Sequence, residues 1–261
     1  MSQLLIGTDP EFFLWDTEQG HHVSAHDMIP GDKKAPHKVP HGAIQVDGTA
    51  VEFNIDPAAS YEEFENNISA VLKHLRKEIP RRYSFDFSPA IEYLPKYFKT
   101  LPATTKELGC DPDFNVKTNA VNVIPKSIGT IRTGSGHIHL GWTKGEDVQP
   151  GGDHFEDCRV MVRQLDKDLD YYLMTITTAY DKDVQRRKYY GNTGAFRAKP
   201  YGVEYRTPSN MWLRSMKQWK MVYDITNTCY NTVLSGKASP SISSRITMKY
   251  CEPDTVMKLG L

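Results

Sequence analysis

Apolar and polar residues alternate along four stretches of the chain, and a period of two is typical of strands whose faces meet different surroundings. The stretches are residues 3–15, 43–57, 127–142 and 195–209. The second is predicted to be a hairpin that turns at Asp47–Gly48, because Asp-Gly tolerates the positive φ angles of tight turns. The fourth is predicted to turn near Pro200–Gly202, and the glycines of the third predict a kinked strand.

A second period, of about 3.6 residues, predicts three helices. The first begins at a capping box formed by Ser60 and Glu63, and longer amphipathic helices are expected at 153–180 and around 216–233. The apolar residues that define them are Phe64, Ile68, Val71, Leu72, Leu75 and Ile79 in the first helix, Cys158, Met161, Val162, Leu165, Leu169, Tyr172, Leu173 and Ile176 in the second, and Met216, Trp219, Val222, Ile225, Cys229 and Val233 in the third.

The order of these elements predicts the fold class. A strand-rich first part interleaved with a few long helices favours an α+β fold with an antiparallel sheet. Residues 1–261 are expected to form a single domain, because sheet-containing enzymes of this length commonly fold as one unit. Residues 20–42 are rich in Gly, His and Pro and predict a long loop, while residues 81–126 predict only a few short strands.

Charge and cysteine content exclude several classes of function. Lys plus Arg and Asp plus Glu both number 32, so the overall charge gives no indication of nucleic acid or an anionic membrane as a partner. The start of the chain becomes acidic too early for a signal peptide, and no apolar run reaches about 18 residues, so a cytoplasmic protein is expected. The cysteines are far apart, which predicts reduced and unpaired thiols; they are Cys110, Cys158, Cys229 and Cys251.

The polar faces of the predicted strands carry an unusual set of side chains. They are Asp9, Glu11, Glu52, Asn54, His137, His139, Glu204 and Arg206. Such a face is often simply solvated, but solvated faces usually mix Lys, Thr, Gln and Ser. Crowded carboxylates repel one another unless a bound cation neutralises them. Many oxygen ligands with one or two imidazoles suit magnesium or manganese better than zinc.

Five motifs, in order, resemble those of the phage-encoded carboxylate-amine ligase family, which shares the catalytic fold of glutamine synthetase and glutamate-cysteine ligase. They are "GTDPEFFL", "VDGTAVEFNIDPA", "GCDPDFN", "GSGHIHLGW" and "YGVEYRTPS", and they extend from Gly7 to Ser209. Within them, "GSGHIH" is similar to the glycine-rich histidine strand of glutamine synthetases, and "VEYR" to the Glu-x-Arg strand of glutamate-cysteine ligases.

This resemblance implies a curved antiparallel sheet with the active site on its concave face and helices on the other. It also implies ATP and magnesium or manganese as cofactors. In such enzymes ATP phosphorylates a substrate carboxylate, and an amine then attacks the acyl phosphate to give an amide. The expected partners are therefore a carboxylate and an amine, as small molecules or peptides, with no membrane and no indication of nucleic acid.

The resemblance further implies roles for single residues. The implied magnesium ligands are Glu11, His137 and Glu204 for one ion and Asp9, Asp47 and Glu52 for another. Arg206 would face the transferring phosphoryl group and His139 would contact the phosphate chain. Glu52 and Arg206 would thus be the catalytic residues.

Acidic residues near turns leave alternatives open. Asp47 could cap its own turn instead of holding a metal, because Asp is favoured in turns for local hydrogen bonding. Asp111 and Asp113 resemble a family motif, yet Asp-Pro-Asp is also an ordinary turn sequence, and a structural role is favoured. Glutamine synthetases and glutamate-cysteine ligases have Glu-x-Glu on the first strand where this chain has Asp9-Pro10-Glu11, so the assignment of Asp9 is weaker than that of Glu11.

Basic residues leave similar alternatives. Arg197 and Lys199 could bind phosphate, or they could form an exposed cationic strand. Lys33 and Lys34 could close over a nucleotide or remain solvated in their loop.

Two other functions compete with a ligase. One is a cupin-like enzyme that uses His137, His139 and Glu204 on a single metal, and it predicts no dependence on nucleotide. The other is a noncatalytic binding module of the same fold, which predicts an incomplete set of ligands. The acidic set is intact, which disfavours the second, and it has more carboxylates than the first requires.

Overall fold

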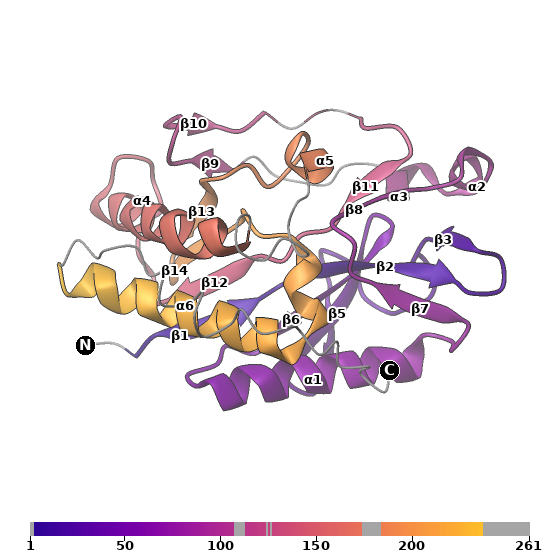
Figure 1. Ribbon diagram of the computed structural model, residues 1–261, viewed down its shortest axis with the longest axis horizontal. Coiled ribbons are helices and arrows are strands. Elements are labelled where there is room, and N and C mark those ends of the chain that lie inside the picture. Colours follow the sequence, from indigo (N-terminus) through magenta and orange to yellow (C-terminus); the bar gives the residue numbers. More distant parts are fainter. Residues whose placement is uncertain (1–2, 107–112, 124, 126, 174–183, 237–261) are drawn as a thin grey trace.

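The computed structural model describes residues 3–106, 113–123, 125, 127–173 and 184–236 of the chain (Figure 1). Two six-stranded sheets and a two-stranded ribbon form its framework. Every pairing between the named strands is antiparallel. The fold is therefore mixed α/β with several antiparallel sheets, which confirms the antiparallel pairing and corrects the expectation of one sheet.

The first sheet combines strands from both ends of the sequence. Its order is β1 (Leu5–Thr8), β12 (Ile138–Gly141), β14 (Gly202–Tyr205), β13 (Ala195–Lys199), β9 (Phe114–Asn115) and β10 (Ala120–Val121). The second sheet has the order β3 (His21–Val23), β2 (Glu11–Asp16), β6 (Ala50–Ile55), β5 (Gly42–Asp47) and β4 (His37–Val39), and β7 (Tyr83–Asp86) pairs with β2. The ribbon is β8 (Ala90–Glu92) with β11 (Ile131–Thr133).

Pro10 divides the strand that was predicted over residues 3–15. Proline has no amide hydrogen to donate to a ladder, so a strand interrupted by it can change partners. Here β1 pairs with β12 in one sheet and β2 pairs with β6 in the other. The predicted kinked strand at 127–142 is divided in the same way, because β11 belongs to the ribbon and β12 to the first sheet.

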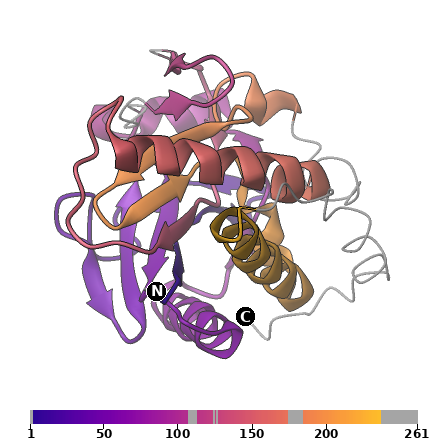
Figure 2. The same ribbon diagram turned by 90° about the vertical axis from the view of Figure 1, so that its left-hand side faces the viewer.

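Three long helices cover the sheets on one side: α1 (Tyr61–Glu78), α4 (Asp153–Leu165) and α6 (Met216–Leu234). Helix α1 contacts β5 and β6 of the second sheet, and α4 contacts β13 and β14 of the first. Helix α6 contacts both other helices and lies between them (Figures 1 and 2). One hydrophobic cluster includes residues from all three helices and both sheets, so a common core joins the sheets.

The predicted capping box is confirmed at α1, where the Ser60 side chain accepts a hydrogen bond from the Glu63 amide at 3.2 Å. The Glu63 carboxylate accepts one from the amide of Ala59, at 2.8 Å. The helix predicted over 153–180 is α-helical to Leu165 and then widens into a π-helical turn, Asp166–Asp170. Its predicted end, with Ile176, lies outside the described residues.

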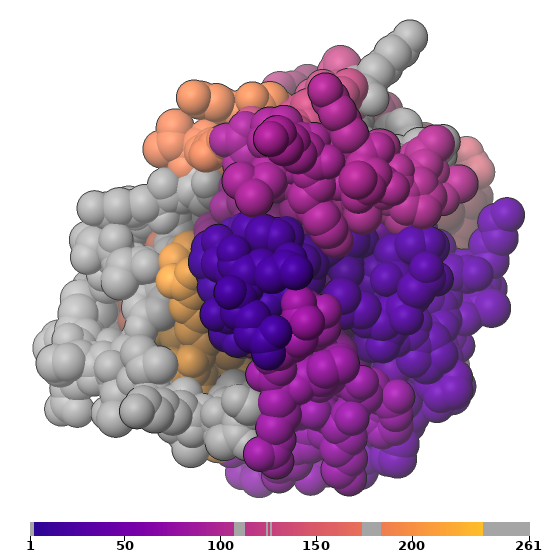
Figure 3. All heavy atoms as spheres, turned by 90° about the vertical axis from the view of Figure 1, so that its right-hand side faces the viewer, coloured from indigo at the N-terminus to yellow at the C-terminus, as the bar shows by residue number. Residues whose placement is uncertain are grey.

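Two predictions about loops are wrong in part. The segment 20–42 contains β3 and β4, so it is not one long loop. The segment 81–126 contains helices α2 (Pro95–Thr100) and α3 (Ala103–Lys106) besides its strands. Figure 3 shows the end of the molecule where the β2–β3 hairpin, in indigo, lies beside the magenta segment with these helices. The shorter elements α5 (Val184–Arg187) and a 3₁₀ turn, Asn210–Arg214, precede and follow β13 and β14.

Both predicted hairpins are confirmed, with their turns shifted slightly. Asp47 pairs with Ala50, so the turn is Gly48–Thr49 and Asp47 is the last strand residue. Gly48 has φ 58°, the positive value that glycine adopts without strain. In the second hairpin Lys199 pairs with Gly202, which places Pro200 and Tyr201 in the turn.

We expect Gly136→Ala to destabilise the fold by about 1–3 kcal/mol, the usual cost of overpacking. A Cβ at Gly136 would lie 2.4 Å from the Ser209 carbonyl oxygen and 2.5 Å from Trp212 Nε1. Gly7→Ala is the control, because its Cβ would meet nothing closer than 3.7 Å. Urea denaturation of both variants measures the free energy of unfolding. Equal unfolding midpoints for the two variants would contradict the prediction.

Within the described ranges, no helix combines the length and apolar character needed to cross a bilayer. Cys158 and Cys229 are free and buried, as predicted, while Cys110 and Cys251 lie outside the described residues. Burial raises the pKa of the Cys158 thiol to about 12, so it stays protonated at neutral pH. These two cysteines are core residues.

Candidate active site

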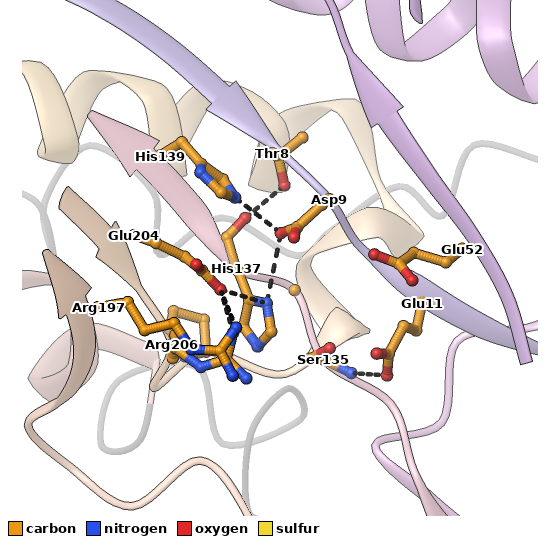
Figure 4. Close-up of polar contacts among 12 residues, drawn as sticks. Thr8, Asp9, Glu11, Glu52, Ser135, His137, His139, Arg197, Glu204 and Arg206 are labelled. Atoms are coloured by element: carbon orange, nitrogen blue, oxygen red, sulfur yellow. Dashed lines mark hydrogen bonds and ion pairs between the residues drawn. The ribbon is translucent and has the colours of Figure 1, made fainter. Parts of the chain in front are cut away.

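The polar faces of the two sheets meet where the chain passes from β1 to β2 at Asp9–Pro10 (Figure 4). The Pro10 carbonyl accepts a hydrogen bond from the Phe53 amide at 3.2 Å, and the Glu11 amide donates to the Ser135 carbonyl at 2.8 Å. Asp9 therefore lies beside the first sheet and Glu11 belongs to the second. One short piece of chain supplies an acid to each side of the junction.

Strand register assembles the polar residues of each sheet into a row. In the first sheet, His139 pairs with Glu204, and Glu204 pairs with Arg197. In the second, Glu52 pairs with both Glu11 and Gln45. Residues paired in an antiparallel ladder point to the same side, so each row presents a set of charged side chains to the junction.

The first cluster, here called the histidine group, consists of Asp9, His137 and Glu204, whose potential ligand atoms all lie within 4.8 Å of one another. His137 Nδ1 is 3.3 Å from Asp9 Oδ1 and 3.5 Å from Glu204 Oε1. His137 is only 4% exposed and Glu204 only 2%, so this face is buried, and the alternative of a simply solvated face does not hold here. The backbone of His137 is fixed by Thr8, whose hydroxyl donates to its carbonyl at 2.6 Å.

Three buried atoms that lie close together around Asp9 have no hydrogen-bond partner: Asp9 Oδ1, His137 Nδ1 and His139 Nε2. His139 Nε2 is nevertheless 3.0 Å from Asp9 Oδ1, so the three atoms are close together without the geometry of hydrogen bonds. Buried polar atoms are nearly always paired, and an unpaired set of this kind calls for a missing partner. A cation bound in the histidine group would satisfy Asp9 Oδ1 and His137 Nδ1, while His139 Nε2, outside that group, is left for another ligand.

The second cluster, the carboxylate group, consists of Glu11, Asp47 and Glu52, again with ligand atoms within 4.8 Å of one another. Glu11 accepts a hydrogen bond from the Ser135 amide at 3.0 Å, and Glu52 accepts one from the Gln45 side chain at 2.7 Å. Figure 4 shows Glu11 and Glu52 on the side of Asp9 away from Glu204. The two clusters thus flank Asp9–Pro10.

The pKa values of the carboxylate group show that its charges are not balanced by the protein. Burial and the neighbouring Asp47 raise the pKa of Glu11 to about 7. Burial together with Asp9, Glu11 and Asp47 raises the pKa of Glu52 well above its usual value. Carboxylates that resist ionisation for these reasons lose their protons readily to a divalent cation, which reverses the repulsion.

The histidine group has the opposite electrostatics. Burial alone would raise the pKa of Asp9, but His139 and His137 outweigh it and hold that pKa well below its usual value. Burial of Glu204 is likewise outweighed, chiefly by Arg206, and the pKa of Glu204 falls to about 2. Burial and Arg206 lower the pKa of His137. Two ionised carboxylates beside a neutral imidazole are a suitable ligand set for a divalent cation.

Arg206 is held on three sides by polar partners and is only 3% exposed. Its Nε donates to Asp113 at 3.1 Å, and its terminal nitrogens donate to Glu204 and to the Tyr190 hydroxyl. Asp113 also accepts a hydrogen bond from the Asn122 side chain at 2.7 Å. The structural role favoured for Asp113 from the sequence is therefore incomplete, because it orients the arginine of the site, whereas Asp111 lies outside the described residues.

The remaining predicted basic residues lie at the edges of the site. Lys199 Nζ is 2.9 Å from Glu204 Oε2, and Arg197 is 3.8 Å from Glu204 Oε1, so both side chains point into the site. Lys33 reaches the carboxylate group, with its Nζ 2.9 Å from Asp47. Lys34 is exposed, which agrees with the solvated alternative.

The structure exchanges two members of the expected clusters. The resemblance placed Glu11 with His137 and Asp9 with Asp47, whereas Asp9 lies with His137 and Glu11 with Asp47. Both clusters contain the kinds of ligand that magnesium and manganese accept. The histidine group and the carboxylate group could therefore each hold one divalent cation.

A cavity of about 860 Å³ opens beside the clusters. Asp9, Glu52 and His139 form the part of its wall next to the clusters. The rest is mainly apolar and is formed by Leu5, Ile55, Pro57, Trp142 and Tyr201, with Gln3, Asn54, Thr143 and Lys144 as the principal polar members. Such a cavity suits an organic molecule with one flat apolar part and one charged part that reaches the clusters.

Comparison with known families gives one match. The sequence profile of the family described as phage phiEco32-like COOH.NH2 ligase-type 2 matches residues 117–255, more than half of the chain. The chain belongs to this ligase family. A search of curated proteins finds no match.

The match to the COOH.NH2 ligase-type 2 family covers one side of the site. It includes His137, His139, Glu204 and Arg206, but it begins after Asp9 of the histidine group and after the whole carboxylate group. The fold brings the carboxylate group next to the matched segment, through contacts such as the Glu11–Ser135 hydrogen bonds.

Some residues of the site were not found from the sequence. Tyr190 and Tyr201 contact His137 and His139, at 3.0 and 2.5 Å. Gln45 contacts Glu52, although it lies one strand away. The tyrosines are in turns, where no periodic pattern marks them, while Gln45 lies two positions before Asp47 on one strand face and could have been identified by the period of two.

Proposed function

We propose that the protein is an ATP- and magnesium-dependent carboxylate-amine ligase that forms an amide through an acyl phosphate. The observation that supports this most is the pair of ligand clusters on the two sides of one strand junction, with a buried arginine beside one of them. Phosphoryl transfer needs positioning and neutralisation of charge rather than covalent help from the protein. The family membership supports the same class of reaction.

In this proposal an oxygen of the substrate carboxylate attacks the γ-phosphorus of ATP, and ADP leaves. The amine then attacks the acyl carbon, phosphate leaves, and the nitrogen loses a proton. Two magnesium or manganese ions, one in each cluster, would neutralise phosphate oxygens and align the two anions. Arg206 stabilises charge on the transferring phosphoryl group, and Asp113 holds its guanidinium in orientation.

The 860 Å³ cavity is the proposed nucleotide pocket. Its apolar wall suits the base, its polar residues suit the ribose, and His139 lies where the phosphate chain would enter the clusters. Arg197 and Lys199 extend the positive charge along β13 toward that chain. Lys33, on the opposite side, neutralises part of the carboxylate group.

The fold, the substrates and the cellular location expected from the sequence are part of the same proposal. The arrangement of helices on one side and polar rows on the other supports a glutamine synthetase-like catalytic fold built from both sheets. The partners would be small-molecule or peptide carboxylates and amines, and the reaction would occur in the cytoplasm.

The test is a screen of carboxylates against amines with ATP and magnesium, in which products are detected by mass. We expect a condensed product with loss of one water, and phosphate released only when both partners are present. The Glu204→Gln variant is the negative control, because it removes a predicted ligand from the histidine group.

Each competing function predicts a different result. A cupin-like enzyme would show metal-dependent turnover without ATP consumption. A noncatalytic module would bind nucleotide without turnover for any pair of substrates. Product formation that continues when ATP is omitted would refute the proposal.

A further inference from the structure

Each histidine of the His137–His139 pair bonds a tyrosine hydroxyl through one ring nitrogen and faces Asp9 with the other. His137 Nε2 is 3.0 Å from the Tyr190 hydroxyl, and its Nδ1 is 3.3 Å from Asp9 Oδ1. His139 Nδ1 is 2.5 Å from the Tyr201 hydroxyl, and its Nε2 is 3.0 Å from the same oxygen of Asp9. The two rings are thus arranged alike, each between a phenol and a carboxylate.

The nitrogens that face Asp9 are the ones without hydrogen-bond partners. A nitrogen that binds a cation must have its lone pair free, so the hydrogen of a neutral imidazole must be on the other nitrogen. In this structure the other nitrogen is in each case the one that meets a phenol. At His137 the Tyr190 oxygen can accept that hydrogen, which fixes both the tautomer and the orientation of the ring. A nitrogen that contacts phosphate must instead carry a hydrogen, so at His139 the Tyr201 hydroxyl donates to Nδ1 and the hydrogen stays on Nε2.

We propose that Tyr190 and Tyr201 are positioning residues that aim His137 and His139 at two different ligands. Tyr190 directs His137 Nδ1 to the cation of the histidine group. Tyr201 directs His139 Nε2 to the phosphates of the molecule in the large cavity. This inference rests on the proposed function, since it requires that cations and a nucleotide bind at the junction.

The contacts of the two tyrosines support this division. Tyr190 follows α5 and accepts a hydrogen bond from Arg206, so it joins the ligand histidine to the arginine. Its oxygen can accept from Arg206 and His137 together, because a phenol oxygen has two lone pairs. Tyr201 lies in the β13–β14 turn and lines the large cavity, as does His139. His139 is outside the histidine group, whose three ligand atoms include His137.

The test uses manganese, which is paramagnetic and suits a mixed nitrogen and oxygen site. Free and bound Mn²⁺ are measured by electron paramagnetic resonance, and the affinity for a nonhydrolysable ATP analogue is measured by calorimetry at saturating Mn²⁺. Tyr190→Phe and Tyr201→Phe each remove one hydroxyl. Tyr97→Phe is the matched control, because its hydroxyl accepts a hydrogen bond from the Ser24 amide at 2.8 Å and, among the described residues, no hydrogen bond joins that hydroxyl to the clusters.

We expect Tyr190→Phe to weaken Mn²⁺ binding at one of the two sites about 10–100-fold, the usual effect of losing a hydrogen-bond partner of a metal ligand. In Tyr201→Phe and Tyr97→Phe both Mn²⁺ affinities should stay within about twofold of those of the parent protein. We expect Tyr201→Phe to weaken binding of the ATP analogue up to about tenfold, the effect of one hydrogen bond. The melting temperatures of the variants separate these effects from a loss of stability.

Equal Mn²⁺ affinity in Tyr190→Phe and the parent protein would overturn the role of Tyr190. An equal loss of Mn²⁺ affinity in Tyr97→Phe would overturn it too, since removing a tyrosine hydroxyl far from the clusters would then have the same effect. Unchanged affinity for the ATP analogue in Tyr201→Phe would overturn the role of Tyr201. If the parent protein itself binds neither Mn²⁺ nor the analogue, the proposed function fails, which distinguishes the two cases.

Discussion

Replacing Arg206 by lysine is expected to lower turnover by about three orders of magnitude and to change nucleotide affinity little, as for other arginines that act on a transferring phosphoryl group. The planar guanidinium bonds Asp113, Glu204 and Tyr190 at the same time. An ammonium has a different shape and presents a single point of charge, so it cannot keep these contacts and also bind a phosphoryl oxygen bidentately.

Steady-state kinetics measure kcat and KM for Arg206→Lys, with the carboxylate and amine that the screen identifies. The concentration of ATP is varied first and that of the carboxylate second. Arg159→Lys is the matched control, because Arg159 binds Glu156 on α4 at 2.7 Å, outside the site, and its replacement should leave turnover unchanged. A normal kcat with only a raised KM for the carboxylate would assign Arg206 to substrate orientation and contradict the phosphoryl-transfer role.

The Glu52→Gln variant is expected to lose more activity than the about 10–100-fold seen when a metal site loses a supporting group, because Glu52 is a ligand of the carboxylate group itself. In the absence of divalent cations the same variant is expected to be more stable than the parent protein. Activity falls because the carboxylate group loses a ligand. Stability rises because Glu52 is buried among Asp9, Glu11 and Asp47, whose repulsion a neutral amide relieves. Glutamine also retains an oxygen that can accept from Gln45, the present partner of Glu52.

This variant should also change the dependence of stability on pH. The pKa of Glu11 rises from an ordinary value of 4.5 to about 7, and that of Glu52 is raised as well. Between about pH 4.5 and pH 7, the ordinary and the raised pKa of Glu11, the folded protein binds more protons than the unfolded chain. The free energy of unfolding therefore falls as the pH rises through this range. Without Glu52, one source of this fall is removed and the curve becomes shallower.

Thermal melts of Glu52→Gln across pH 4–8, with and without Mg²⁺, measure both effects; this range surrounds the pKa change of Glu11 from 4.5 to about 7. The exposed Glu62 provides the control variant Glu62→Gln, which should show neither effect. Stabilisation by Mg²⁺ as large in Glu52→Gln as in the parent protein would contradict the ligand role of Glu52.

Local sequence patterns predicted much of the fold. The period of two identified both hairpins and the polar faces with Glu52, His139 and Glu204, because side-chain direction in a strand follows from sequence position alone. The capping box at Ser60 and Glu63 likewise identified the start of α1, because its hydrogen bonds are local. Helices α2 and α3 were missed, since each is too short to show a helical period.

The clusters could not be predicted in the same way. Asp9 and Glu11 are two residues apart, and on one uninterrupted strand they would face the same cluster. The chain instead changes sheets at Pro10, and this depends on pairing with β12 and β6, which are far away in the sequence. Tyr190 and Tyr201 were missed for a related reason, because turn residues acquire partners only when distant strands are brought together.

The short chain segment through Pro10 also sets an upper limit on the distance between the backbones of the two clusters. Asp9 and Glu11 belong to different clusters, yet their α-carbons are two peptide units apart and so cannot separate by more than about 7 Å. Any change in the angle between the two sheets would leave that limit unchanged. Covalent geometry, rather than side-chain packing, therefore limits the distance between the two clusters. One residue inserted after Asp9 would raise this upper limit, even if every ligand were retained.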